Sequence, residues 1–167
     1  MQLNHYNSKF KQQLFPLTVV ADNINNAPNI GSLFRTCDAF GVHQLVLCGG
    51  NIELGRKMTK TSRSTEKNVN FSIEENALTV VKELKQKGAK IIGLEITSKS
   101  ISVQNLDVRK EKNLVIIVGS EKFGISEQLL ELCDEVVHID MFGQNSSMNA
   151  VQATSIALYE ITKQLSS

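Results

Sequence analysis

The sequence predicts an α/β protein with a mainly parallel sheet and helices on both faces of that sheet. Short β-branched runs such as Leu17–Ala21 and Leu114–Val118 alternate with segments whose apolar residues recur at helical spacing. This alternation is typical of parallel strands joined by crossover helices. The chain of 167 residues, 41% of them hydrophobic, is long enough for one domain with a substantial core. We therefore treat 1–167 as a single domain.

The first part of the chain predicts two strands and one helix after a polar segment. Residues 1–16 carry scattered apolar side chains and are expected to form an N-terminal arm or a short helix. Leu17–Ala21 is the first expected strand. Turn residues follow it, and a helix is expected from Asn29 to a glycine cap at Gly41. Gln44–Leu47 is the second expected strand.

A polar, irregular segment at 51–70 carries a local excess of positive charge. Its basic side chains outnumber Glu53 and Glu66, and they are Arg56, Lys57, Lys60, Arg63 and Lys67. A charge run of this kind is ordinarily a solvated loop or helix face. The alternative is a patch that contacts the phosphates of a nucleic acid.

The second half of the chain continues the alternation of strands and helices. Its expected elements are a helix from Ile73 to Leu84 capped by Gly88, a strand at Lys90–Leu94, a polar linker at 98–112, a strand at Leu114–Val118, a short helix at Gln128–Leu132, a strand at Glu135–Ile139 and a helix from about Ser147 to the C-terminus.

Two of these strands end in loops rich in Gly, Ser and Asn. Gly119–Gly124 reads GSEKFG, and Met141–Asn149 reads MFGQNSSMN. Ligands of open α/β sheets lie beyond the carboxyl ends of the strands, so the two loops predict one shared small-molecule pocket. The first loop is neither a P-loop nor G-x-G-x-x-G. Glu121 is placed to hold a polar group there, although a tight turn with an exposed acid fits the spacing equally well.

Composition limits the remaining function classes. The formal net charge of +1 gives no overall nucleic-acid footprint but leaves room for a local patch. Three widely spaced cysteines indicate free thiols in a reducing compartment, and no signal peptide or membrane-length apolar run is visible, so we expect a cytoplasmic protein. The three histidines are isolated, and no cluster of metal ligands is visible, so no metal site is expected.

Three segments in order resemble the motifs of the SpoU/TrmH branch of the SPOUT RNA methyltransferases. They are Asn29–Gly41 (NIGSLFRTCDAFG), Ile116–Ile125 (IIVGSEKFGI) and Ile139–Gly143 (IDMFG) with Ser147-Met148-Asn149. Ser64–Lys67 also resembles a segment between the family's first two motifs. The resemblance spans residues 17–161.

The resemblance implies features that composition and spacing do not. It implies that the C-terminal part is threaded into a deep trefoil knot, which general rules of topology disfavour. It implies S-adenosylmethionine as the cofactor, held mainly by backbone groups after the strands, and a homodimer through the terminal helix and the first-motif helix. The matching cofactor-binding positions are Leu94, Gly119, Ile139 and Met148.

The reaction that the resemblance implies is methyl transfer to a ribose 2′-hydroxyl. The family assigns activation of that hydroxyl to the first-motif arginine, here Arg35. Arginine normally keeps its charge, so Arg35 either loses its proton to act as a base or, as we favour, holds a phosphate and stabilises the developing negative oxygen. Asn29, Glu121, Ser147 and Asn149 would position Arg35 and the ribose.

The same residues have ordinary structural explanations. Arg35 on its own would be read as a surface arginine of a helix. Ser147 and Asn149 are good caps for the terminal helix, which is compatible with a catalytic role.

Three positions depart from the family pattern. Met148 stands where Leu is usual, which conserves volume. Gln152 stands at a position where the family usually has a small residue, so its side chain needs a polar partner or a water molecule if a dimer packs there. Ser64 stands where Gly is frequent, which leaves the path of that loop open.

The sequence therefore predicts an S-adenosylmethionine-dependent RNA ribose 2′-O-methyltransferase acting on tRNA or rRNA. RNA would be bound by Arg56, Lys57, Lys60 and Arg63. One alternative is an RNA-binding SPOUT protein that binds the cofactor without transferring a methyl group. Another is an unrelated nucleotide-binding α/β enzyme, such as a nicotinamide-dependent one, against which the absent G-x-G-x-x-G argues.

Overall fold

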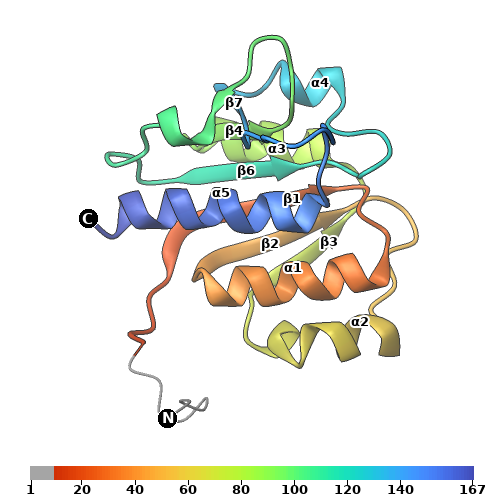
Figure 1. Ribbon diagram of the computed structural model, residues 1–167. Coiled ribbons are helices and arrows are strands. Elements are labelled where there is room, and N and C mark those ends of the chain that lie inside the picture. The colour runs from red at the N-terminus through yellow and green to blue at the C-terminus, as the bar shows by residue number, and fades with distance from the viewer. Residues whose placement is uncertain (1–9) are drawn as a thin grey trace.

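The computed structural model describes residues 10–167, and its centre is a seven-stranded sheet in the order β3-β2-β1-β6-β4-β7-β5 (Figure 1). Every strand pairing in this sheet is parallel, so the predicted sheet type is confirmed. The strands are β1 (Phe15–Asp22), β2 (Val42–Cys48), β3 (Phe71–Glu74), β4 (Lys90–Leu94), β5 (Ile101–Ser102), β6 (Leu114–Val118) and β7 (Glu135–His138).

Helices cover both faces of the sheet, as predicted. They are α1 (Ala27–Ala39), α2 (Arg56–Ser62), α3 (Ala77–Gln86), α4 (Glu127–Leu130) and α5 (Ala150–Leu165), with 3₁₀ turns at Thr65–Lys67 and Val103–Asn105. Helices α1 and α5 pack on one face, and α2 lies against the outer side of α1; α3 and α4 contribute to the core on the opposite face (Figure 1). Gly31 of α1 permits the close approach of α2, because a Cβ there would overlap the backbone of Met58.

The alternating side chains of the strands build two separate apolar cores. Val19 of β1 faces the core that contains α1 and α5, whereas its neighbour Val20 faces the core that contains α3. All five residues of β6 are buried, as a central parallel strand requires. This strand is the most apolar of those predicted, and it runs directly into the first Gly-rich loop.

The prediction for the segment after Gln44–Leu47 was wrong in two places. Ile73 does not begin a helix: it lies in edge strand β3 and is 46% exposed. The helix begins at Ala77, because the side chain of Asn76 accepts hydrogen bonds from the backbone N–H groups of Leu78 (2.8 Å) and Thr79 (3.3 Å). The segment at 51–70 is also not irregular throughout, since it contains α2 and a 3₁₀ turn.

Element boundaries also shift at other places. Helix α1 starts at Ala27, two residues before the predicted start, because Asn26 caps it and Pro28 fits its first turn. Helix α5 starts at Ala150 rather than near Ser147. The linker at 98–112 contains the two-residue strand β5. Residues 10–14 form no regular element, β1 already begins at Phe15, and the rest of the predicted N-terminal arm lies outside the described residues.

The last strand enters the sheet between two strands that precede it. β7 pairs with β4 on one side and with β5 on the other, although β4 and β5 are joined by a loop of only six residues, 95–100. The chain then turns back, and α5 crosses the same face of the sheet as α1 (Figure 1). Loops from three distant parts of the sequence therefore meet at the carboxyl ends of β4, β6 and β7.

Candidate functional site

A cavity of about 400 Å³ lies at the carboxyl ends of β4, β6 and β7. This volume is within the ordinary range for small-molecule sites. Its walls come from the loops after these three strands and from the start of α5. All four positions predicted to bind the cofactor line it, as do two of the predicted catalytic residues; these six are Leu94, Gly119, Ile139, Met148, Glu121 and Ser147.

Glu95, which the sequence reasoning missed, ties two of these loops together. Its Oε2 accepts a hydrogen bond from the backbone N–H of Ile125 (3.0 Å), and its Oε1 accepts one from the N–H of Ile96 (2.9 Å). Its own backbone N–H donates to Val137 O of β7 (2.9 Å). The side chain lies directly against Gly124. A carboxylate one residue after a predicted strand was the only sequence signal for this role.

Asn29, Glu121 and Asn149 form a hydrogen-bonded cluster beside the cavity, although they are far apart in sequence. Asn29 Nδ2 donates to Glu121 Oε1 (3.3 Å), and Asn149 Nδ2 donates to Asn29 Oδ1 (3.2 Å) and to Glu121 Oε1. The three side chains come from α1, from the loop after β6 and from the N-cap of α5. Three of the five predicted catalytic residues are thus brought together.

Asn149 also caps α5, as its residue type predicted. Its Oδ1 accepts hydrogen bonds from the backbone N–H groups of Val151 (2.9 Å) and Gln152 (3.3 Å). The cap leaves the amide Nδ2 free to donate to the cluster, so capping and cluster formation use different atoms of one side chain. Ser147 is exposed, and its hydroxyl donates to Asn145 Oδ1 (3.4 Å) rather than to the cluster.

The charge around the cavity is negative. Among the described residues, two carboxylates line it, those of Glu95 and Glu121, and no Lys or Arg does. The other walls are largely apolar, with side chains of Val118, Ile125 and Leu130. A cationic ligand with an apolar part is favoured by such a lining, whereas the pyrophosphate of a dinucleotide would have no cation to pair with.

The structure does not bring Arg35 to this cluster. Arg35 is exposed on α1 and makes no hydrogen bond or ion pair with any residue in 10–167. It follows Asn29 by six residues, which corresponds to about 9 Å along a helix and to a different side of it. Its catalytic role stays a prediction.

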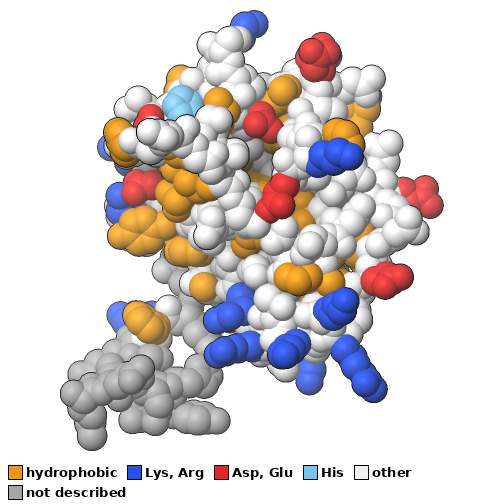
Figure 2. Space-filling model, turned by 45° about the vertical axis from the view of Figure 1, so that its right-hand side comes forward, with side chains coloured by type: hydrophobic (Ala, Val, Ile, Leu, Met, Phe, Trp, Pro, Cys, Tyr) orange, Lys and Arg blue, Asp and Glu red, His pale blue; other side chains and the backbone are white. Residues whose placement is uncertain are grey.

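The four predicted RNA-binding residues lie on one short helix and at the residue that follows it. Arg56, Lys57 and Lys60 belong to α2, and Arg63 follows it in a left-handed conformation with φ of 53°. All four are exposed, and we call them the basic patch. Figure 2 shows Lys and Arg side chains gathered at the lower end of this face, where Figure 1 places α2 beside α1.

The backbone conformation of Ser64, the residue after the basic patch, shows why glycine is frequent at this position in the family. Ser64 has φ of 69°, in the left-handed region, and a glycine at this position would adopt that conformation without strain. After Ser64 the chain forms the 3₁₀ turn at Thr65–Lys67. The Ser62 hydroxyl donates a hydrogen bond to Glu66 Oε2 of this turn.

Other reactive groups of the described chain are poorly suited to chemistry. Burial raises the pKa of Cys37 to about 12, of Cys48 to about 12 and of Cys133 to about 11. His138 is half-buried, and its Nδ1 lies 2.9 Å from the Ser100 hydroxyl. Within 10–167 no group of three or more His, Cys, Asp or Glu side chains is arranged to hold a metal ion. No helix in this range is both long and apolar enough to cross a membrane.

A parallel α/β sheet with a partly apolar cavity at its strand ends defines a small-molecule-binding protein of the α/β class. Within that class, the chain belongs to the SpoU rRNA methylase family, whose model matches residues 16–159.

Relatives and solved structures agree with this assignment. A tRNA (guanosine(18)-2′-O)-methyltransferase of Aquifex aeolicus is 30% identical over 148 residues, which cover 89% of this chain and 69% of the relative. The 23S rRNA (guanosine-2′-O-)-methyltransferase RlmB of Blochmanniella floridana is 29% identical and matches 93% of this chain but only 61% of its own length. The crystal structure of the A. aeolicus TrmH/SpoU tRNA modifying enzyme superposes with a TM-score of 0.81 at 30% identity, over 92% of this chain and 77% of that one.

A further structure shares the fold at lower identity. The SpoU methyltransferase AviRb from Streptomyces viridochromogenes, in complex with AdoMet, has a TM-score of 0.80 at 23% identity. The match covers 96% of this chain and 64% of that one.

Proposed function

We propose that this protein is an S-adenosylmethionine-dependent RNA ribose 2′-O-methyltransferase that acts on tRNA or rRNA. The observation that carries the proposal is the cluster of Asn29, Glu121 and Asn149 beside the strand-end cavity. The relatives named above act on guanosines of tRNA and 23S rRNA, which supports RNA as the substrate.

The residues of the cavity fit S-adenosylmethionine. Apolar side chains would enclose the adenine, and the backbone at Leu94, Gly119, Ile139 and Met148 would hold it. When bound, this cofactor supplies a methyl group on a positively charged sulfur. The carboxylates of Glu95 and Glu121 would favour that positive charge electrostatically, and the absence of Lys and Arg among the described lining residues leaves it unopposed.

The cluster supplies a hydrogen-bond acceptor that is held in place. Glu121 Oε1 accepts hydrogen bonds from the side-chain amides of Asn29 and Asn149. Its Oε2 makes no hydrogen bond with the described residues and can accept one from a ribose 2′-hydroxyl. With the cofactor bound, the hydroxyl oxygen would take the methyl carbon while the electron pair of the carbon–sulfur bond goes to the sulfur. The hydroxyl proton would pass to Glu121 Oε2, which accepts its hydrogen bond. Fixing the hydroxyl in line with the methyl group supplies much of the rate enhancement.

A homodimer would bring a cation, the guanidinium of Arg35, to the cluster of Asn29, Glu121 and Asn149. Arg35 does not contact the cluster of its own chain, so we propose that Arg35 of a second copy reaches the site across an interface made by α1 and α5. These helices pack along each other, with Thr36 Oγ1 3.1 Å from Ser155 Oγ. Arg35 would hold a phosphate and stabilise the developing charge on oxygen.

The surface of α5 supports such an interface. Gln152, Ile156 and Tyr159 follow one another at helical spacing on its exposed side, and Tyr159 is 57% exposed. An exposed stripe with two large apolar side chains suits burial against a second copy. Gln152 would need a polar partner or a water molecule there.

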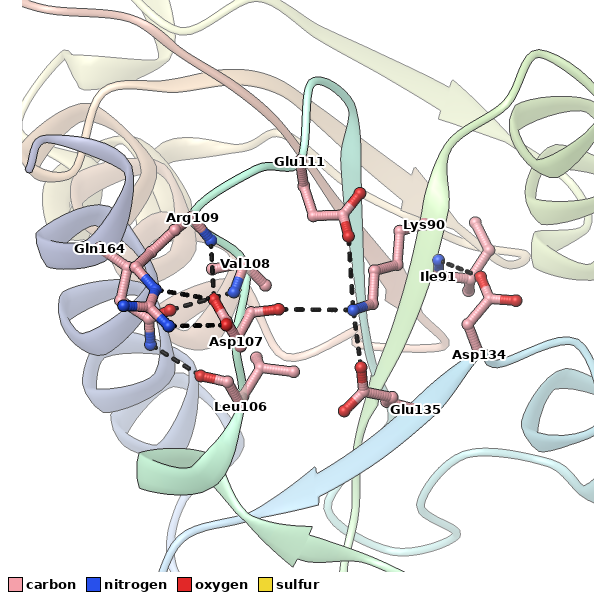
Figure 3. A network of polar contacts seen from close by, with 10 residues as sticks. All are labelled: Lys90, Ile91, Leu106, Asp107, Val108, Arg109, Glu111, Asp134, Glu135 and Gln164. Atoms are coloured by element: carbon pink, nitrogen blue, oxygen red, sulfur yellow. Dashed lines mark hydrogen bonds and ion pairs between the residues drawn. The ribbon is translucent and has the colours of Figure 1, made fainter.

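We also propose that the C-terminal part of the chain is threaded into the trefoil knot that the resemblance implies. The insertion of β7 between β4 and β5 supports this proposal. A threaded chain end must be surrounded by an earlier loop, and the loop before β6 is attached to α5 (Figure 3). Gln164 of α5 accepts a hydrogen bond from Val108 N–H (3.0 Å) and donates one to Leu106 O (2.9 Å). Lys90 joins the same loop to β7 through Glu111 (3.5 Å) and Glu135 (2.6 Å).

The basic patch would bind the RNA backbone, since three of its exposed cations lie on α2 and the fourth, Arg63, directly follows this helix. We also place the protein in the cytoplasm. Three cysteines without disulfides support a reducing compartment.

The first test is a calorimetric titration with S-adenosylmethionine, with NADH as the control ligand. We expect S-adenosylmethionine to bind near one per chain and NADH not to bind. Binding of NADH alone would refute the assignment of the cavity.

The second test examines whether Arg35 acts across the dimer. Arg35→Ala and Glu121→Ala should each abolish methyl transfer to RNA, while Arg35→Ala keeps cofactor binding nearly intact. Mixed dimers of the two variants contain one site with both residues, so an equimolar mixture should regain about a quarter of the wild-type activity. A mixture as inactive as each parent would place Arg35 and Glu121 of the same chain in one site. An Arg35→Ala protein that still methylates RNA at the wild-type rate would remove Arg35 from the mechanism.

A further inference from the structure

A second cavity adjoins the proposed methyl-transfer site. It has a volume of about 480 Å³ and lies at the carboxyl ends of β1 and β6. Ser120, Phe123 and Gly124 line both cavities, so the loop 119–124 forms the wall between them. Glu121, with its bonds to Asn29 and Asn149, belongs to the same wall. The Glu121 cluster and the second cavity are therefore carried by the same loop.

Phe123 presents an aromatic ring at this wall instead of burying it. The residue is 78% exposed, although large apolar side chains of this protein are mostly in the two cores. The turn that carries it is fixed, because the Ser120 hydroxyl accepts a hydrogen bond from Phe123 N–H (3.2 Å) and Ser120 O accepts one from Gly124 N–H (2.8 Å). Lys122 Nζ lies 5.0 Å from the ring centroid. An exposed ring carried on a hydrogen-bonded turn, with a cation beside it, is suited to stacking against a flat, polar ring.

The rest of the cavity offers exposed polar groups. Asn25 and Ser126 are exposed, and the Ser126 side chain makes no capping hydrogen bond at the start of α4. Asp22 is half-buried, and its Oδ1 accepts from Asn23 Nδ2 (2.9 Å), which leaves Oδ2 available. Burial raises the pKa of Asp22 above its ordinary value, against the opposing effect of the Asn23 hydrogen bond. Together these groups can donate hydrogen bonds to a ligand in front of Phe123 and accept them from it.

We infer that this cavity receives the base of the nucleotide that is methylated. Phe123 provides the stacking face, and Asn25 and Ser126 contact the edge of the base. The inference rests on the proposed function, because it takes the Glu121 cluster as the position of the ribose. A base is attached directly to its ribose, so a ribose at the cluster brings its base to this wall. Enzymes that act on one nucleotide commonly unstack its base and place it against an aromatic side chain.

The kinetic test uses three substitutions at Phe123 and separates stacking from packing. Phe123→Ala should lower kcat/KM for the RNA substrate roughly 5- to 150-fold, the usual effect of losing one base stack. Phe123→Leu keeps the apolar bulk but should lose nearly as much, whereas Phe123→Tyr should stay near the wild-type value. Because Phe123 also lines the cofactor cavity, the loss in kcat/KM of Phe123→Ala and Phe123→Leu should clearly exceed any loss of affinity for S-adenosylmethionine, measured by calorimetry. Wild-type efficiency of Phe123→Leu, or a matching loss of cofactor affinity, would overturn the inference.

The binding test does not depend on methyl transfer. The chain contains no Trp, so Phe123→Trp introduces a single fluorescent reporter at the wall. Titration with bulk tRNA and with bulk rRNA should quench its emission with at least one of them, and adding Asn25→Ala should shift the midpoint to higher RNA concentration. Unchanged emission with both RNAs, or an unchanged midpoint, would overturn the inference. If the wild-type protein binds RNA at this wall but transfers no methyl group, the proposed function fails while the base site stands.

Discussion

Gly124 offers a sharp test of how the cavity is held together. Its φ is 63°, and a residue with a Cβ loses about 1 kcal/mol in this region. A Cβ would also overlap Glu95 Oε2, which accepts the hydrogen bond from Ile125 N–H. A hydrogen bond to a charged group contributes about 1.5–3 kcal/mol. Gly124→Ala should therefore lower the free energy of unfolding by about 2.5–4 kcal/mol, and Tm by about 5–15 °C.

The matched control is Gly88→Ala, which carries the backbone strain without the clash. Gly88 has φ of 85°, and nothing lies within 4 Å of the position of its Cβ. Its Tm should fall by only about 2–4 °C in thermal melts followed by circular dichroism. Calorimetry should show weaker binding of S-adenosylmethionine for Gly124→Ala alone. Equal Tm losses in the two variants would refute the idea that Glu95 ties the loops together.

Two further predictions concern charge. Neutralising Lys57, Lys60 and Arg63 should weaken RNA binding and flatten the slope of log Kobs against log salt by about 2, measured by filter binding; an unchanged slope would remove the basic patch from the RNA site. Partial desolvation of the Asp134 carboxylate opposes its charge, but the backbone N–H of Ile91 and the Lys85 ammonium outweigh this and hold the pKa of Asp134 below its ordinary value. Its charge thus stabilises the fold at pH values above the ordinary pKa of an aspartate, and this stabilisation is lost as pH falls through the lowered pKa. Asp134→Asn should melt below the wild type at pH 7 and converge with it in strong acid; a constant Tm difference at all pH values would contradict this reasoning.

The fold class could be predicted because local patterns dominate it. The apolar runs of β1 and β6 and the helical period of α1 need no tertiary information. Edge strand β3 was missed, because its two half-buried and two exposed residues carry too weak a pattern beside the strong helical period of α3, which follows it. The position of β7 between β4 and β5 is set by long-range pairing, which no local pattern encodes.

The candidate site was predicted unevenly for a similar reason. The resemblance named Asn29, Glu121 and Asn149, and these side chains are hydrogen-bonded to one another. It did not name Glu95 or the exposed ring of Phe123, since their roles depend on which loops meet in space. For Arg35 the difficulty is different: the resemblance predicted it as a site residue, but a side chain that would act across an interface has no partner within the described part of its own chain.

The origin of the cavity walls has a consequence for motion. The walls are drawn from residues 94–97, 118–130 and 138–153, so the cavity is complete only while the start of α5 is docked. A ligand that binds only the docked state stabilises it, by about 2.7 kcal/mol at a hundred times its Kd. Amide hydrogen exchange in the first turns of α5 should then slow when the cofactor is present, while exchange in β3 at the far edge stays the same. The exchange rate of the α5 amides would thus report whether the cavity is occupied.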